Sequence, residues 1–356
     1  MSSTATSNQG PGLQIRDNLA NDYSDIYTPE ALAALVHMSQ YNVEQKRLMD
    51  ERTKRRLTRM RDHQPVGFLP ADGEIEGTGI RVQDARDGTV VGAVIPHDLQ
   101  RQWLQGTGPA AKPNSPVQAN LRNVAYALLS GADGWMFDGE DALGQITTMS
   151  LDNQRSLKLA IARDPQFLEV AEAVSEEMNA WARDFFGHEI IADWCKQLDF
   201  TTKIFRARGL HLDDRHIRLD GQSFSASITD MTLYVVNNYK VLQAAGSSIV
   251  LYLPKIQTAE EAGFWNRLLS ALESYLALDE GTIKVYVLVE QLEATFQLME
   301  IRAALGLHFV GFNTGRWDYI NSVSDANCWD PGFILSLIHI SEPTRQLMSS
   351  RMPSSA

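Results

Sequence analysis

Short apolar segments alternate with amphipathic segments of helical length over most of this chain. The apolar segments lie at residues 134–137, 204–205, 249–253, 285–289 and 309–312. Continuous apolar strands that alternate with amphipathic helices are typical of a parallel sheet with helices on both faces. The alternation therefore predicts an α/β fold, built either as a (β/α) barrel or as a doubly wound sheet.

Composition narrows the classes of protein to which the chain can belong. Its 356 residues allow one large barrel or two mid-sized domains, and 44% apolar residues exclude a mostly disordered chain. The formal charge of −12 argues against general nucleic-acid binding, and no apolar run approaches the ~20 residues of a membrane span. Cys195 and Cys328 form neither a disulfide framework nor a zinc-binding spacing. We therefore expect neither a nucleic acid nor a membrane as a partner.

The chain divides into four expected segments. These are a flexible tail at 1–25, a helical and hairpin clasp at 26–98, a barrel at 99–334 and a separate tail at 335–356. Within the clasp, Thr28 and Pro29 predict the start of a helix that continues to Asp62, because Thr suits the N-cap and proline the first helical position.

Two further patterns occur in the clasp. Residues 81–83 and 90–94 flank Asp87 and Gly88, and this spacing predicts a β-hairpin. Residues 46–61 are rich in Lys and Arg, which suits either a nucleic-acid or membrane patch or the solvated face of a helix. The acidic residues interleaved with them favour the solvated face.

Charged residues or glycine-rich turns follow the apolar strands. They are Asp138, Glu140 and Asp141, then Arg206 and Arg208, then Pro254 and Lys255, then Glu290, and finally Gly315, Arg316, Trp317 and Asp318. In parallel α/β folds the ligand lies at the carboxyl ends of the strands, so these residues are expected at one rim. Glu290 and Asp318 follow consecutive strands, and two carboxylates without a nearby His or Cys suit Mg²⁺.

The other residues at these strand ends suggest supporting roles. Arg206 would place a fixed cation beside the metal, where it suits a developing oxyanion. Asp138, Glu140 and Asp141 would contact metal-bound waters, and the amides of 315–317 would hold a small carboxylate. Each acidic residue alone is more often a surface charge or a helix cap, and Arg208 is open to a purely structural role. The convergence of the strand ends favours a single site.

These residues resemble the malate synthase family, in particular its shorter, A-type branch. The motifs that carry the resemblance are Phe205-Arg206-Ala207-Arg208-Gly209-Leu210-His211-Leu212, Tyr252-Leu253-Pro254-Lys255, Val289-Glu290 and Asn313-Thr314-Gly315-Arg316-Trp317-Asp318-Tyr319-Ile320. Weaker similarity includes the acidic motif at Asp138 and extends from Ile26 to Ile320.

The resemblance implies a TIM (β/α)8-type barrel with an N-terminal helical clasp. It also implies an acyltransferase of the glyoxylate cycle that condenses acetyl-CoA with glyoxylate and hydrolyses the thioester, giving malate and CoA. Glu290 and Asp318 would then hold Mg²⁺, and Arg206 would stabilise the enolate of acetyl-CoA. Pro254 and Lys255 would contact CoA, although a solvated loop residue explains Lys255 equally well. The implied compartment is the cytoplasm or, in a eukaryote, a peroxisome or glyoxysome.

Three departures from the family pattern alter these expectations. Gly139 stands where the family usually has an aromatic residue, and Gln291 where it often has Thr. The family's general base is an Asp in a C-terminal helical domain, and no matching segment occurs in this sequence. Two alternatives therefore stay open: a related β-hydroxyacyl-CoA lyase, and a non-catalytic protein that binds CoA or a metal.

The last residues of the chain differ from the rest. Residues 335–345 resemble the translation of a transposase-based sequencing adapter, and residues 350–356 that of the flanking library primer. We therefore expect a C-terminally truncated chain with a non-native tail from Leu335, in which about six of the eight barrel strands are present. Such an inactive fragment would lack the general base.

Overall fold

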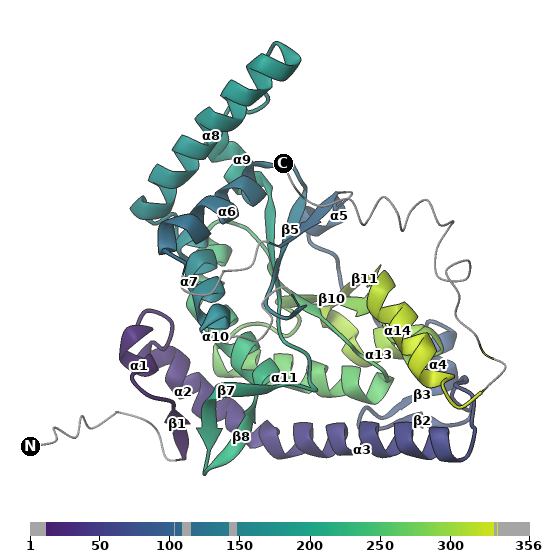
Figure 1. Cartoon of the computed structure of the whole chain (residues 1–356). Coiled ribbons are helices and arrows are strands. Elements are labelled where there is room, and N and C mark those ends of the chain that lie inside the picture. The colour runs from purple at the N-terminus through teal and green to yellow at the C-terminus, as the bar shows by residue number, and fades with distance from the viewer. Residues whose placement is uncertain (1–11, 103, 109–114, 142–147, 331–332, 334–356) are drawn as a thin grey trace, which may run out of the picture.

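A curved parallel sheet of six strands forms the centre of the computed structural model, which describes residues 12–102, 104–108, 115–141, 148–330 and 333 (Figure 1). The strands are β4 (Gln105–Thr107), β5 (Gly134–Asp138), β6 (Thr202–Arg206), β9 (Ile249–Leu253), β10 (Ile283–Val289) and β11 (Phe309–Thr314). Their order is β11-β10-β9-β6-β5-β4, and each neighbouring pair is parallel. This arrangement confirms the predicted α/β fold and an incomplete TIM-type barrel.

Helices follow the strands along the chain. They are α6 (Val117–Leu129), α7 (Met149–Ile161), α8 (Pro165–Phe186), α9 (Trp194–Phe200), α10 (Ala226–Ala244), α11 (Ala259–Tyr275), α12 (Leu292–Thr295), α13 (Leu298–Leu305) and α14 (Arg316–Ala326). In α11, Thr258 Oγ1 accepts a hydrogen bond from the Glu261 backbone at 3.3 Å, as its N-cap position predicts. Its apolar stripe, which includes Trp265 and Leu269, is fully buried.

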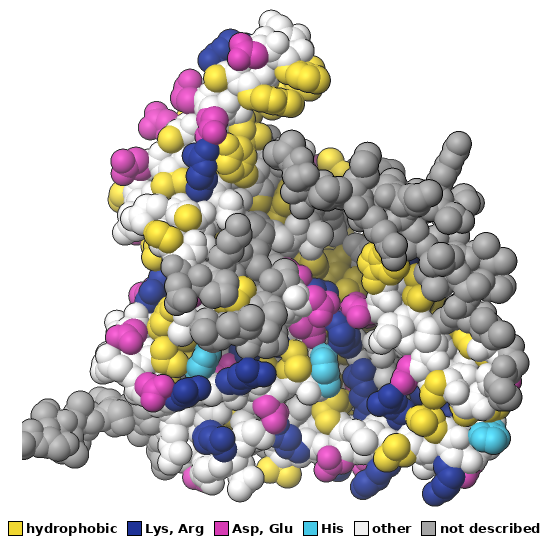
Figure 2. Space-filling model, viewed as in Figure 1, with side chains coloured by type: hydrophobic (Ala, Val, Ile, Leu, Met, Phe, Trp, Pro, Cys, Tyr) yellow, Lys and Arg dark blue, Asp and Glu magenta, His cyan; other side chains and the backbone are white. Residues whose placement is uncertain are grey.

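The free end of α8 projects beyond the rest of the molecule (Figure 1). Pro165 occupies the first turn of this helix, and Gly187 ends it in the left-handed conformation with φ of +79°. Near that end, Trp181 stacks on Phe185, Phe186 packs edge-on against both rings, and all three side chains are largely exposed. Hydrophobic side chains are visible at this end of the molecule (Figure 2).

The N-terminal clasp consists mainly of helices. They are α2 (Pro29–Met38), the 3₁₀ turn η1 (Ser39–Tyr41), α3 (Asn42–Arg61), α4 (Val82–Arg86) and α5 (His97–Gln100). Thr28 Oγ1 accepts from the Ala31 backbone at 3.2 Å, which confirms the predicted helix start. The single helix expected up to Asp62 is instead divided by η1 into two helices. No helix in the described residues has the length and apolar character needed to cross a membrane.

The expectation of a flexible tail at 1–25 is wrong for the residues that the structure describes there. Strand β1 (Leu13–Ile15) pairs antiparallel with β7 (Asp213–Leu219), which also pairs with β8 (Gln222–Ser225). Leu13 and Ile15 are buried, so their alternation around Gln14 gives this strand one apolar face. A short helix, α1 (Leu19–Asp22), follows. Residues 1–11 and the expected tail at 335–356 lie outside the described residues.

The hairpin predicted from residues 81–94 is also wrong. Residues 82–86 form α4, and the short hairpin lies earlier, between β2 (Glu74–Ile75) and β3 (Ile80–Arg81). Val82 and Ala85 are three residues apart and both buried, which is helical rather than strand periodicity. Val91 and Val94 are exposed and belong to no strand.

The basic helix α3 has the expected solvated face only in part: Lys54, Arg56 and Arg61 are exposed, whereas other arginines bind the barrel. Arg59, which is buried, contacts Glu293 at 2.6 Å. Arg52 and Arg55 lie 3.8 and 3.4 Å from the buried Glu261. These ion pairs hold the clasp across the rim where the strands end (Figure 1).

Candidate active site

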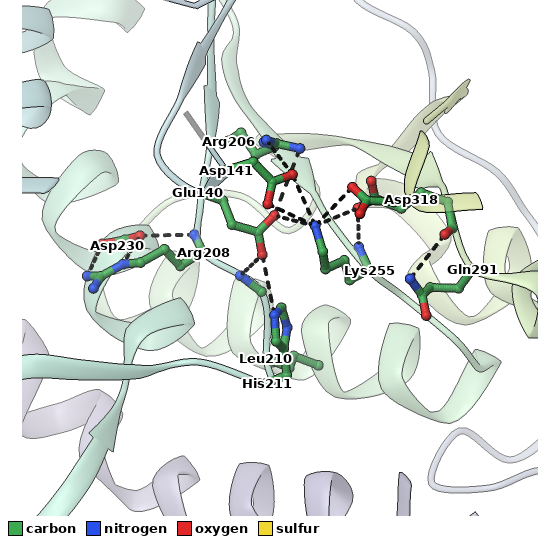
Figure 3. Close-up of polar contacts among 12 residues, drawn as sticks. Glu140, Asp141, Arg206, Arg208, Leu210, His211, Asp230, Lys255, Gln291 and Asp318 are labelled. Carbon is green, nitrogen blue, oxygen red and sulfur yellow. Dashed lines mark hydrogen bonds and ion pairs between the residues drawn. The ribbon is translucent and has the colours of Figure 1, made fainter. Parts of the chain in front are cut away.

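The carboxyl ends of five neighbouring strands, β5, β6, β9, β10 and β11, bring charged side chains together (Figure 3). Asp138 ends β5 and is followed by Glu140 and Asp141, while Arg206 ends β6. Lys255 follows β9, Glu290 follows β10, and Asp318 lies in the first turn of α14 after β11. Parallel pairing places all of these ends on one edge of the sheet, as the sequence predicts.

Three carboxylates at this rim are close enough to share a cation. One oxygen each from Asp141, Glu290 and Asp318 lies within 4.8 Å of the others. A site made only of carboxylate oxygens suits a hard cation such as Mg²⁺, so the residues present fit the implied metal. The structure thus places Glu290 close to Asp318, as expected, and Asp141 lies beside them.

Arg206 is fixed by the acidic motif after β5. Its Nε and Nη2 donate to the two oxygens of Asp138 at 2.8 and 2.7 Å, and Nη2 also donates to Asp141 at 3.1 Å. Burial opposes the charged guanidinium, but hydrogen bonding to Asp138 and the adjacent acidic charges leave the Arg206 pKa raised. The remaining Nη1 lies 3.9 Å from Glu140 Oε2. Arg206 is therefore a permanently charged, oriented cation at the rim.

Lys255 places its ammonium among four carboxylates. Nζ lies 3.2 Å from Glu140, 3.1 Å from Asp141, 3.2 Å from Asp318 and 3.8 Å from Glu290. Burial alone would lower the Lys255 pKa, but these carboxylates raise it.

Glu290 is the deepest of the three carboxylates at the candidate metal site, with an exposed fraction of 1%. Burial raises its pKa to about 8; Lys255 opposes that shift, and the neighbouring Asp318 adds to it. Gly315 allows the next strand end to approach, because a Cβ at this position would lie 2.8 Å from Glu290 Cβ. The Gly315 amide donates to the Val289 carbonyl at 3.0 Å.

Glu140 links the rim to the turn after β6. It accepts from the Gly209 amide at 3.1 Å and lies 3.9 Å from His211 Nε2. Burial, together with Arg52 and Lys255, lowers the pKa of His211 to about 4, so the imidazole is neutral at pH 7. Arg208 has a structural role here: its side chain pairs with the buried Asp214 and Asp230 at 2.6 and 2.7 Å.

A cavity of about 410 Å³ opens between α3 and the strand ends. Its lining includes Arg52, Arg56, His211, Gln257, Gln291 and Asp325. Acidic and basic side chains gather at the centre of this face, above α3 (Figure 2). The sequence does not predict that arginines of α3 line this cavity. A run of charged residues on a helix does not indicate which part of the fold the helix packs against.

Comparison with known proteins agrees with this architecture. The family model for the malate synthase TIM barrel domain matches residues 202–348. Malate synthase from Myxococcus xanthus (strain DK1622) is 30% identical over 313 residues, 88% of this chain and 51% of the relative. Malate synthase A from Escherichia coli (strain K12) is 33% identical over 228 residues, and the glyoxysomal malate synthase of Candida tropicalis is 30% identical over 332. The Escherichia coli match covers 64% of this chain and 38% of that relative. The Candida tropicalis match covers 93% of this chain and 54% of that relative.

The chain belongs to the malate synthase family. It spans about half the length, or less, of the curated relatives just described. The match to the family model continues beyond Leu335 into the segment expected to be non-native, and the origin of that segment stays a prediction.

The two substitutions in the malate synthase pattern have local explanations. A Cβ at Gly139 would lie 2.4 Å from the Arg206 carbonyl oxygen and 3.0 Å from the Phe205 ring, so the space for a side chain is already filled. Gln291 accepts from Arg52 at 3.4 Å and from Gln257 at 3.1 Å. It therefore ties α3 to the end of β10.

The remaining expected residues lie farther from the centre of the candidate site. Trp317 is 54% exposed, and the Arg316 guanidinium lies 5.0 Å from the centre of its ring. The Gly315 backbone lies against Glu290. Pro254 is buried and lies directly before Lys255. The contact with CoA that the sequence suggests for this pair stays a prediction.

Proposed function

We propose that this chain contributes the metal- and substrate-binding strand ends of a malate synthase, which condenses acetyl-CoA with glyoxylate and hydrolyses the thioester to malate and CoA. The observation that carries the proposal is the position of Arg206 beside Asp141, which itself clusters with Glu290 and Asp318. Family membership supports the reaction, and the oxygen-only cluster supports Mg²⁺ as the metal. Relatives named glyoxysomal favour a peroxisome-type compartment if the source is a eukaryote.

In this proposal Asp141, Glu290 and Asp318 hold the ion, and the amides near Gly315 hold the glyoxylate carboxylate. When bound, Mg²⁺ supplies Lewis-acid polarisation of the glyoxylate carbonyl. Arg206 stabilises the negative oxygen that develops on the acetyl group when it loses a proton. Asp138 keeps the guanidinium oriented for this purpose, because it occupies both Nε and Nη2.

Binding and turnover test the proposal separately. We expect calorimetry to show glyoxylate binding to the chain only when Mg²⁺ is present, and Asp318→Asn to remove that binding. Exposed Asp279 provides the control variant, Asp279→Asn. Equal glyoxylate affinity with and without Mg²⁺ would overturn the metal role. Because the chain is expected to lack the general base, we expect no release of CoA from acetyl-CoA with either glyoxylate or pyruvate. Rapid release with glyoxylate would overturn the expectation of an inactive fragment.

A further inference from the structure

The backbone of Lys255 is fixed on both sides of its peptide. Its N–H donates to Glu290 Oε1 at 2.8 Å, and its carbonyl accepts from Arg52 Nη1 at 2.9 Å. Its φ of +53° lies in the left-handed region, which a non-glycine residue adopts rarely. The turn after β9 therefore directs this one side chain toward the carboxylates, while the flexible lysine stem leaves the ammonium able to move.

The Lys255 ammonium uses the same oxygens that a metal would need. It hydrogen bonds to both oxygens of Asp141, at 3.2 and 3.1 Å, and to Asp318 Oδ2 at 3.2 Å. Glu290 Oε1 lies 3.8 Å away. A Mg²⁺ ion takes carboxylate oxygens at about 2.0–2.1 Å, which brings it into the space that the ammonium fills. Two cations cannot both occupy the centre of this cluster.

Lys255 is also the principal counter-charge for two of the three proposed ligands. Arg206 pairs with Asp138 and Asp141, whereas the ion pairs described for Glu290 and Asp318 are those with Lys255. Glu290 is almost fully buried beside Asp141 and Asp318, and carboxylates this close together repel one another unless a cation lies between them. The ammonium thus supplies the charge compensation that the metal-free cluster requires.

We propose that Lys255 is a built-in counter-ion of the metal cluster, which a divalent cation must displace from Asp141, Glu290 and Asp318 in order to bind. This inference rests on the proposed metal site and adds a competitor to it. The displaced ammonium swings away on its own stem, because the peptide of Lys255 stays bound to Glu290 and Arg52. The contacts between Lys255 and the carboxylates stabilise the metal-free chain. Because metal binding breaks them, the same free energy is lost from metal binding.

This competition has an unusual consequence for mutagenesis. Lys255→Met removes the ammonium and keeps much of the apolar stem, so the metal no longer has a cation to displace. We expect the variant to bind Mn²⁺ or Mg²⁺ at least about tenfold more tightly than the wild type and to be less stable without metal. A lysine that supported metal binding, or that served only as a substrate contact, would give weaker or unchanged metal affinity.

The experiment uses the full chain, freed of metal with EDTA and dialysed, and titrated with Mn²⁺ by electron paramagnetic resonance and calorimetry. Lys240→Met is the control, because Lys240 is exposed on α10 and pairs with Glu30 away from this cluster. Lys255→Arg keeps the positive charge and should not show the tenfold gain. Unchanged or weaker Mn²⁺ affinity in folded Lys255→Met overturns the inference.

A second measurement requires no variant. Reductive methylation followed by mass spectrometry should label Lys255 more completely with saturating Mg²⁺ than without it, relative to Lys240 in the same sample. Equal labelling at Lys255 in both states overturns the displacement. Asp318→Asn separates the two proposals: if it binds Mn²⁺ as the wild type does, the metal site itself is wrong. If Asp318→Asn loses Mn²⁺ binding but Lys255→Met binds Mn²⁺ no more tightly than the wild type, only the counter-ion role is wrong.

Discussion

Arg206 and Asp138 form a bidentate ion pair across β6 and β5, with both N–H···O distances below 2.9 Å. The two residues are opposite each other in the parallel register of these strands. Both are nearly buried, so the pair is shielded from water and from salt. This geometry makes the orientation of the guanidinium a property of the sheet rather than of a mobile loop.

The first prediction concerns this pair. Asp138→Ala removes both acceptors and leaves a buried guanidinium with weaker compensation, so we expect the free energy of unfolding to fall by about 3 kcal/mol. Urea unfolding measures this loss. Glu177→Gln is the control, because it breaks an ion pair with Arg122 that is exposed on both sides, and exposed pairs contribute little to stability. Equal losses of unfolding free energy in the two variants would show that burial does not strengthen the Arg206–Asp138 pair.

The second prediction concerns metal-dependent stability. Binding to the folded chain alone stabilises it, so Mg²⁺ should raise the melting temperature of the wild type. Glu290→Gln removes a ligand that lies at the centre of the proposed site, and we expect it to abolish the rise measured by differential scanning calorimetry. Glu280→Gln changes an exposed residue away from the cluster and should retain the rise. A similar Mg²⁺ effect in Glu290→Gln would exclude Glu290 as a ligand.

Much of this rim could be predicted from the sequence because strand ends have fixed positions in a parallel sheet. The apolar runs before Arg206, Glu290 and Asn313 are continuous, and each of them forms a parallel strand in the structure. Parallel register then places the residues that follow these runs on the same edge. That geometry explains why Glu290 and Asp318 could be paired without any knowledge of their side-chain contacts.

Other features depend on tertiary contacts that local sequence does not encode. Arg52 and Arg59 belong to a charge run, and their partners Glu261 and Glu293 lie far away in the sequence. Val91 and Val94 match a strand pattern but lie exposed, while Val82 and Ala85 are buried on one face of a helix. Lys255 could be named as a site residue, but its place among four carboxylates depends on the left-handed turn after β9.

The third prediction concerns the buried amine of Lys203 at the start of β6. Burial lowers its pKa to about 8, against an ordinary value of 10.5 that the unfolded chain should retain. Between these pH values the unfolded chain binds the proton that the folded chain has lost, so the fold gains stability as pH rises through this window. Below pH 8 the penalty for burying the charge is fully present, at about 3 kcal/mol.

Lys203→Met should therefore be more stable than the wild type at pH 7, and this advantage should shrink as pH approaches 10. Urea unfolding at several pH values measures the difference between the two proteins. The control is Lys54→Met, which changes an exposed lysine on α3 and should give a difference that is constant with pH. A constant difference for Lys203→Met as well would show that Lys203 stays charged in the folded chain.

The last prediction concerns Glu273, a buried carboxylate that joins the end of α11 to the start of β10. It accepts backbone hydrogen bonds from Gly281 at 2.9 Å and Ile283 at 2.6 Å, and its Oε2 lies 3.0 Å from Nε2 of the buried His308. Glu273→Gln replaces one acceptor oxygen with an NH₂ group that faces an N–H donor. We expect it to lower the free energy of unfolding by about 2 kcal/mol, because a buried donor loses its partner.

Denaturant unfolding of Glu273→Gln and of Glu280→Gln, an exposed neighbour on the same connection, measures this effect. Hydrogen exchange should also show faster exchange of the Gly281 and Ile283 amides in Glu273→Gln, since their acceptor is altered. Glu290 follows the other end of β10, so loosening its start should reach the proposed metal site only weakly. Unchanged stability together with unchanged amide protection would show that Glu273 is not the link between this helix and strand.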